Sequence, residues 1–237
     1  MSYLVTAFVI GFLIFVHELG HLLAAWAVGM PVERFSIGFG PVLWARRLRG
    51  VEYCISLVPL GGYVLPKCED EAEFLQISLW RRIVMWLGGP LANFVFAAIL
   101  LAAINGTTDG PTAYGLLVQP WIQVVSMTAN FLVALPSVFA HPSQLSGIVG
   151  IVAIGKTVME TGWVSMLKFA VLLNLNLGVF NLLPIAPLDG GKILCSLLEK
   201  VHPRLAGLHN TLAVVGLALL LFLMLYTTVL DVMRQIA

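Results

Sequence analysis

Four long segments of this 237-residue sequence are almost entirely apolar, at residues 3–28, 83–104, 163–183 and 208–230. A helix of about 20 apolar residues is long enough to span a hydrocarbon core about 30 Å thick. The composition agrees, because 59% of the residues are hydrophobic and 11% are charged, against roughly 45–50% and about 25% in soluble domains. We therefore expect an α-helical polytopic membrane protein with about four transmembrane helices, forming a single domain over residues 1–237.

Residues 32–66 have a different pattern. The stretches VERFSIGFG and VEYCISLVPLGGYV alternate large with small or polar side chains, and GPVLWARRLRG between them is rich in turn residues. Alternation with period two is typical of strands, and the turn-rich connection indicates a hairpin. We therefore expect a membrane-associated β-hairpin or sheet between the first two spans.

Basic residues predict the orientation of the chain. Cytoplasmic loops carry an excess of Lys and Arg, and seven of the 13 lie between the first two spans: Arg34, Arg46, Arg47, Arg49, Lys67, Arg81 and Arg82. Residues 31–82 are therefore expected in the cytoplasm. The basic residues that follow the third span predict the same side for residues 190–206, and both termini then lie outside.

Residues 121–140 are ambiguous between a further span and a helix lying in the membrane interface. The predicted orientation requires an even number of crossings between the second and third spans, and none is the simplest solution. We therefore expect an interfacial amphipathic helix over residues 121–140.

The net charge of +1 argues neither for nor against binding to nucleic acid. No basic run interleaved with aromatic side chains resembles a nucleic-acid surface. The expected surroundings and partners are therefore the lipid bilayer and other membrane proteins.

The first apolar segment contains His17-Glu18-Leu19-Gly20-His21, an HExxH motif. Two histidines at positions i and i+4 project from one helical face, so both imidazoles can reach one Zn²⁺, and the adjacent carboxylate can act as a base. Ionisable residues near the middle of a bilayer cost roughly 2.5–3.5 kcal/mol each and need partners. The alternative is a buried His/Glu cluster that hydrogen-bonds to other helices.

A hydrolytic zinc site usually has three protein ligands and an open position. Asp189 follows a helix interrupted by Pro184 and Pro187, and irregular backbone at membrane depth is tolerated where it lines a protein cavity. Asp189 is therefore the preferred third ligand, with a role as a helix N-cap as the alternative. The remaining histidines lie in loops or at a helix edge: His141, His202 and His209.

These motifs together carry a resemblance. FVHELGH, VERFSIGFGPVLW, YCISLVPLGGYV, GGPLANF and NLLPIAPLDGG occur in this order over most of the chain. The sequence resembles the site-2 protease family of intramembrane metalloproteases, most closely the bacterial regulator-of-sigma-E protease branch. Relatives in that branch carry PDZ domains between the second and third spans, and this chain has only a loop and the expected interfacial helix there.

The resemblance implies roles for individual residues. It matches His17, His21 and Asp189 to the ligands of one Zn²⁺ and Glu18 to the catalytic glutamate. It also matches Asn181 to an asparagine that faces bound substrate.

The resemblance further implies that residues 32–66 form a membrane-reentrant sheet with an edge for an extended substrate. We place this edge at residues 51–58, with Ile55 and Leu57 as substrate contacts. Asn93 in GGPLANF either lines the active-site cleft as a further substrate contact or makes an interhelical hydrogen bond.

The expected function is that of a zinc-dependent endopeptidase that hydrolyses a peptide bond in or near a substrate transmembrane helix. The expected substrate is a single-pass membrane protein or a signal-peptide remnant, and the expected location is the bacterial inner membrane. Two alternatives come from other functional classes. A divalent-metal transporter would also place His and Asp at mid-membrane, and an inactive membrane adaptor would keep the fold but lose the glutamate, which this chain retains.

Overall fold

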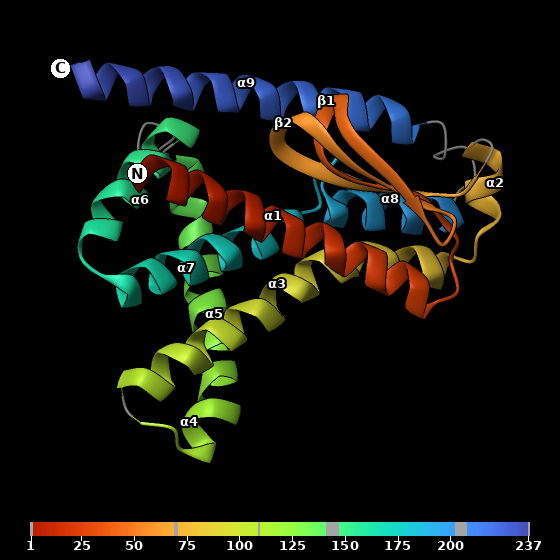
Figure 1. The fold of residues 1–237 in the computed structure, drawn as a ribbon. Coiled ribbons are helices and arrows are strands. Elements are labelled where there is room, and N and C mark those ends of the chain that lie inside the picture. The colour runs from red at the N-terminus through yellow and green to blue at the C-terminus, as the bar shows by residue number, and fades with distance from the viewer. Residues whose placement is uncertain (1, 69–70, 109, 141–146, 202–207, 237) are drawn as a thin grey trace. The chain divides into compact units, whose positions relative to one another are not determined.

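The computed structural model describes residues 2–68, 71–108, 110–140, 147–201 and 208–236 (Figure 1). These residues are mostly helical, and the strands among them lie between the first two long helices. The elements in chain order are α1 (Ser2–Ala27), β1 (Val32–Leu48), β2 (Val51–Pro66), α2 (Glu71–Gln76), α3 (Leu79–Thr108), α4 (Ala113–Leu117), α5 (Gln119–Ala140), α6 (Ile148–Glu160), α7 (Trp163–Asn181), α8 (Asp189–Val201) and α9 (Leu208–Ile236).

Among the described residues, four helices are long and apolar enough to cross a membrane. They correspond to the four expected spans and cover Leu4–Ala27, Leu79–Thr108, Trp163–Asn181 and Thr211–Arg234. The expected fold class, helical with about four spans and a small sheet, is confirmed.

The region between the second and third spans holds more helix than expected. The segment predicted to be interfacial is one continuous helix, α5, which runs through Pro136. Helix α6, which has 13 residues, was not expected from the sequence. This helix is apolar but shorter than the 18 or more residues that mark a spanning helix in sequence.

The described chain divides into two compact units. The first comprises residues 1–10, 94–179 and 213–237, and the second comprises residues 11–93 and 180–212. Helices α1, α3, α7 and α9 each contribute residues to both units.

In the first unit, α3, α5 and α7 share an apolar core. Its buried members are Ala97, Ala98, Leu101, Ile104, Val124, Val171 and Leu175. Asn105 of α3 adds a polar connection, because its amide donates to Gly115 O at 3.1 Å and to Gln123 Oε1 at 3.1 Å. These contacts hold α5 against α3.

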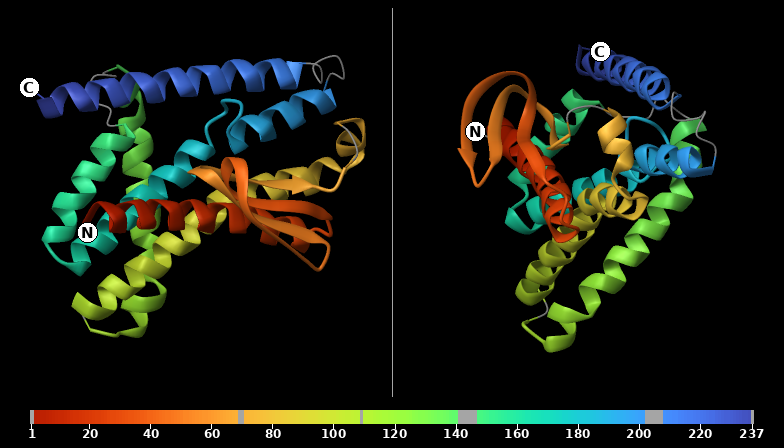
Figure 2. Two further views of the ribbon diagram at one scale, coloured as in Figure 1. Left: turned by 45° about the horizontal axis from the view of Figure 1, so that its top comes forward. Right: turned by 90° about the vertical axis from the view of Figure 1, so that its right-hand side faces the viewer.

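In the second unit, the sheet packs against the C-terminal half of α1 and the start of α3. The buried core contains Leu22, Ala25, Val28, Met30, Val32, Phe35, Val51, Val64 and Met85. Figure 2 shows the two long strands curving beside α1. Apolar side chains from the inner face of the sheet thus cover the part of α1 that carries the HExxH motif.

The two strands pair antiparallel, and each is bent so that one segment of β1 is paired on both sides. Residues 34–37 have partners in residues 52–55 and also in residues 62–65. Residues 42–48 pair only with residues 51–56. Register shifts between Ile37 and Trp44 mark the bend, and Gly38 and Gly40 there adopt φ angles of 90° and 82°, which glycine tolerates.

The sheet edges therefore differ from the expectation. Residues 52–55 have a partner on each side, so the prediction that residues 51–58 form an edge is wrong for this segment. Alternation in sequence reports which face of a strand is exposed, whereas the bend in β1 decides which strands lie beside it. Residues 42–48 and 62–66 are paired on one side only and form the edges.

Candidate metal centre

Small residues bring α1 and α3 into close contact within the second unit. A Cβ at Gly20 would overlap the carbonyl oxygen of Gly88 and lie 2.5 Å from Ala92 Cβ, and one at Gly88 would lie 2.5 Å from Ala24 Cβ. Larger side chains at these positions would separate the two helices. The close approach of the two helices brings the α3 backbone to the histidines of α1.

The α3 backbone orients His21. The Nδ1 atom of His21 lies 2.8 Å from the carbonyl oxygen of Met85 and 3.3 Å from the amide nitrogen of Gly89. The shorter contact makes Nδ1–H the donor to Met85 O, which leaves a lone pair on Nε2. A Cβ at Gly89 would overlap His21 Nε2 and lie 2.7 Å from His17 Cε1, so glycine is required here.

The Asn93 side chain lies against the same ring nitrogen of His17 that the Met85 carbonyl contacts in His21. Asn93 is fully buried, and its amide Nδ2 is placed 3.0 Å from His17 Nδ1. The two ends of an amide are interchangeable in such a contact. With the amide oxygen toward His17, Nδ1–H donates to it and the Nε2 lone pair of His17 is available.

A sharp turn places Asp189. Helix α7 ends at Asn181, and α8 begins at Asp189 after a non-helical segment that contains Pro184 and Pro187, neither of which can donate a backbone hydrogen bond. Gly190 and Gly191 lie so close to the backbone of this segment that a Cβ on either would overlap it. The two glycines of LDGG therefore allow the turn to fold over the start of α8.

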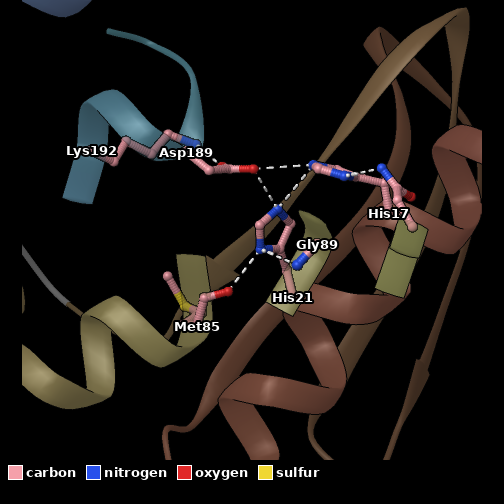
Figure 3. Close-up of polar contacts among 7 residues, drawn as sticks. His17, His21, Met85, Gly89, Asp189 and Lys192 are labelled. Atoms are coloured by element: carbon pink, nitrogen blue, oxygen red, sulfur yellow. Dashed lines mark hydrogen bonds and ion pairs between the residues drawn. The ribbon is translucent and has the colours of Figure 1, made fainter. Parts of the chain in front are cut away.

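The three candidate ligands converge on one point, as Figure 3 shows. His17 Nε2 and His21 Nε2 each lie 3.1 Å from Asp189 Oδ2 and 3.2 Å from one another. All three residues are buried. Ligands at about 2.0–2.2 Å from a tetrahedral Zn²⁺ lie about 3.3 Å apart, so two imidazole nitrogens and one carboxylate oxygen in this triangle fit zinc and leave one coordination position.

Lys192 holds the second oxygen of Asp189. Its Nζ donates to Asp189 Oδ1 at 3.3 Å and lies 4.3 Å from the centre of the Trp86 ring. Burial acts to raise the pKa of Asp189, whereas the nearby Lys192 charge acts to lower it. The ion pair with Lys192 thus favours the carboxylate anion that a cation requires.

Glu18 lies between the histidines and the sheet. Its side chain is 8% exposed, and a Cβ at Gly62 would lie 2.6 Å from Glu18 Cγ and 2.6 Å from Ser36 O. The strand segment that begins at Gly62 therefore passes directly beside the carboxylate side chain. Its next residues form one of the two sheet edges.

A partly buried ion pair connects α3 to α8 within the second unit. Arg82 Nη1 and Nη2 donate to the two carboxylate oxygens of Glu199 at 3.1 and 3.3 Å, and the guanidinium lies 5.5 Å from the centre of the Phe74 ring. This paired geometry fixes direction as well as distance. From the sequence, Arg82 was expected only to contribute to the cytoplasmic positive charge, and this contact was not predicted.

The candidate substrate residues lie in different surroundings in the structure. Ile55 and Leu57 are 47% and 56% exposed on the sheet. Asn181 is half-buried at the end of α7, whereas Asn93 lies against His17. Of the remaining histidines, His209 lies in the first turn of α9, and His141 and His202 lie outside the described residues.

Comparison with curated proteins shows a consistent set of relatives. The chain is 39% identical over 149 residues to a candidate zinc metalloprotease of Chlamydia pneumoniae, an alignment that covers 55% of this chain and 24% of that protein. It is 26% identical to candidate zinc metalloproteases of Campylobacter jejuni and Fusobacterium nucleatum, with 100% and 99% of this chain and 94% and 99% of those proteins covered.

The alignments also show that relatives contain additional segments. The alignment with the Campylobacter jejuni protein is 347 positions long, whereas this chain has 237 residues. That protein therefore has internal residues without a counterpart in this chain. The chain spans about a quarter of the length of the Chlamydia pneumoniae protein.

A sequence profile matches nearly the whole chain. The profile describes Peptidase family M50 and covers residues 5–223. This range includes nearly all of the first long apolar helix, all of the second and third, the first half of the fourth, and the His17–His21–Asp189 cluster. Together with these helices, the match identifies a multi-pass membrane protein whose surroundings are a lipid bilayer. The chain belongs to Peptidase family M50.

Proposed function

We propose that this protein is a zinc-dependent endopeptidase that hydrolyses a peptide bond in or near a transmembrane segment of its substrate. The observation that carries the proposal is the buried triangle of His17 Nε2, His21 Nε2 and Asp189 Oδ2 with edges of 3.1, 3.1 and 3.2 Å. The first ligand pair lies within a helix long and apolar enough to span a membrane, which supports cleavage at membrane depth.

Each residue of the site has a distinct role in this proposal. His17, His21 and Asp189 hold the zinc ion, which when bound polarises the scissile carbonyl and acidifies water. Glu18 accepts the proton of the attacking water at its carboxylate and then delivers it to the leaving amine. Asn93 and the Met85 carbonyl orient the two imidazoles, so we assign Asn93 a positioning role rather than contact with substrate.

The substrate is proposed to bind as an added strand. A transmembrane helix hides its peptide bonds in internal hydrogen bonds, and pairing with a sheet edge would hold an unwound segment open. The edge at residues 62–66 begins beside Glu18, which favours it over the edge at residues 42–48. Ile55, Leu57 and Asn181 remain proposed side-chain contacts with the substrate.

The proposed setting follows the distribution of basic residues. We place the protein in the bacterial inner membrane with both termini outside and with residues 31–82 and 190–206 in the cytoplasm. A single-pass membrane protein or a signal-peptide remnant then reaches the site from within the bilayer. We also propose that no PDZ domain lies between α3 and α7.

A single substitution tests the chemistry. Glu18→Gln keeps the shape of the side chain but removes the base, so purified protein should retain zinc while cleavage of a membrane-embedded single-pass reporter is abolished. Glu160→Gln is the matched control, since Glu160 is exposed on α6, and it should cleave at the wild-type rate. Wild-type cleavage by Glu18→Gln would refute the role of Glu18.

A divalent-metal transporter is a weaker candidate. Transport requires a series of polar ligands along a path through the membrane. Within the described part of the chain, His, Cys, Asp and Glu side chains form one group able to hold a metal ion. Chelator-sensitive cleavage of the reporter without movement of zinc into vesicles would distinguish the protease from the transporter.

A further inference from the structure

Charge and apolar surface are segregated along the length of the sheet. Residues 41–50 are all exposed. Towards the bend of β1, the exposed side chains are apolar: Phe39, Val42, Leu43, Trp44 and Val58. At the opposite end, beside the turn at residues 49–50, three arginines lie within four positions: Arg46, Arg47 and Arg49. We name these three residues the arginine turn.

Contacts with α1 show how deep in the membrane each end of the sheet lies. Val51, which follows the arginine turn, shares a buried core with Ala25 and Val28 at the end of the apolar span Leu4–Ala27. The bend lies near Gly62, which contacts Glu18 in the interior of α1. The arginine turn is therefore level with the end of the span, where phosphate headgroups lie, and the apolar bend is level with acyl chains.

The arginine turn has positive charge that the protein does not neutralise. Residues 34–51 contain no Asp or Glu. Glu52 lies opposite Arg47 in the register, but its Oε2 accepts from Arg34 Nε at 2.6 Å. Among the described residues, no ion pair involves the three arginines, so their charges are available to an external anion.

The conformation of Arg49 also indicates a use for its side chain. Arg49 and Gly50 have φ angles of 50° and 86°, as in the two-residue hairpin turns that favour Asn-Gly. A left-handed backbone is unfavourable for arginine, and asparagine adopts it more readily. The presence of arginine here is explained if its guanidinium binds a ligand.

We propose that the arginine turn binds the phosphate groups of anionic phospholipids and thereby fixes the depth of the sheet in the membrane. Guanidinium groups make paired hydrogen bonds to phosphate, and the exposed Trp44, Leu43 and Val42 lie on the acyl-chain side of these headgroups. This inference rests on the membrane insertion of the sheet in the proposed function, but not on catalysis.

Lipid titration of the intact detergent-solubilised protein tests this inference. Native mass spectrometry would count bound phosphatidylglycerol and phosphatidylcholine for wild type and for the Arg46→Gln/Arg47→Gln variant. Phosphatidylglycerol affinity should fall about fivefold for each arginine removed, with phosphatidylcholine binding unchanged. The control Arg81→Gln/Lys200→Gln removes the same charge from exposed positions outside the sheet and should change this affinity by less than about twofold.

Arg49→Asn separates lipid binding from folding. Asparagine favours the turn, so the thermal unfolding midpoint should stay the same or rise, while phosphatidylglycerol affinity falls about fivefold. Wild-type affinity in both arginine-turn variants, or an equal loss in the control, would overturn the proposal. Because lipid binding is read without cleavage, an inactive protein that still selects phosphatidylglycerol would contradict the proposed protease but not this inference.

Discussion

Asp189 and Asp231 are both carboxylates only 3% exposed, yet their surroundings differ in kind. Asp231 Oδ2 accepts the backbone N–H of Gly150 at 2.8 Å in the first turn of α6, and Arg234 lies 3.6 Å from Oδ1. Asp189 faces two imidazole nitrogens that themselves have backbone or amide partners. Burial marks both residues, whereas the nature of their partners separates a helix cap from a metal ligand.

The largest difference is expected when each carboxylate is removed. Asp189→Ala should lose zinc and all detectable reporter cleavage, because one of three ligands is absent. Asp231→Asn should retain one zinc per chain and lose about 1–3 kcal/mol of stability through a weaker cap. Zinc content by mass spectrometry and thermal unfolding measure the two effects, and full zinc content in Asp189→Ala would assign Asp189 to capping as well.

A methyl group added beside the ligands should reduce zinc content almost as much as the removal of Asp189. Gly89→Ala places a Cβ against His21 Nε2, so zinc content should fall well below one per chain. Gly11→Ala is the matched control in α1, because nothing lies within 4 Å of a Cβ there. If Gly89→Ala binds zinc as well as Gly11→Ala does, the close packing of α3 on the site has no functional role.

The positioning role of Asn93 predicts an intermediate effect. Loss of a partner that orients a ligand typically costs 10–100-fold in metal affinity, so Asn93→Ala should weaken zinc binding by that factor in a chelator competition. Asn93→Asp should restore it, since a carboxylate also accepts from His17 Nδ1. Asn105→Ala, at a similarly buried position of α3, should leave zinc affinity unchanged, and equal losses at both positions would indicate a general packing defect.

The smallest expected effect is a difference in substrate contact between the two sheet edges. A photo-crosslinking residue at Leu65 lies in the edge beside Glu18, and one at Leu43 lies in the other edge; both side chains are exposed. With inactive Glu18→Gln protein, crosslinks to the reporter should form from position 65 and not from position 43. The reverse pattern would move strand addition to residues 42–48.

The spans and the two histidine ligands could be predicted from sequence patterns because each depends on residues close together in the chain. Hydropathy identifies an apolar helix without knowledge of its neighbours, and HExxH places two ligands on one face of a single helix. The third ligand, Asp189, came from combining HExxH with the proline-interrupted helix and from the family resemblance. Helix α6 was not expected because its 13 residues fall below the length that hydropathy detects.

Contacts between distant segments were less predictable. The Met85 carbonyl that orients His21 has no side-chain signature, and the requirement for glycine at Gly89 becomes clear only when α3 lies against α1. The bend in β1 pairs residues 34–37 on both sides, which alternation alone does not reveal. Arg82 and Glu199 are 117 residues apart, and nothing in either local sequence indicates their pairing.

Zinc K-edge X-ray absorption spectroscopy on the purified protein identifies the ligands of the metal ion. We expect one zinc per chain with two imidazole nitrogens at about 2.0–2.1 Å and oxygen in the remaining shell, and one imidazole fewer in any zinc retained by His21→Ala. A zinc shell that contains sulfur, or one that is unchanged by His21→Ala, would contradict the assignment of His17, His21 and Asp189 as the metal centre.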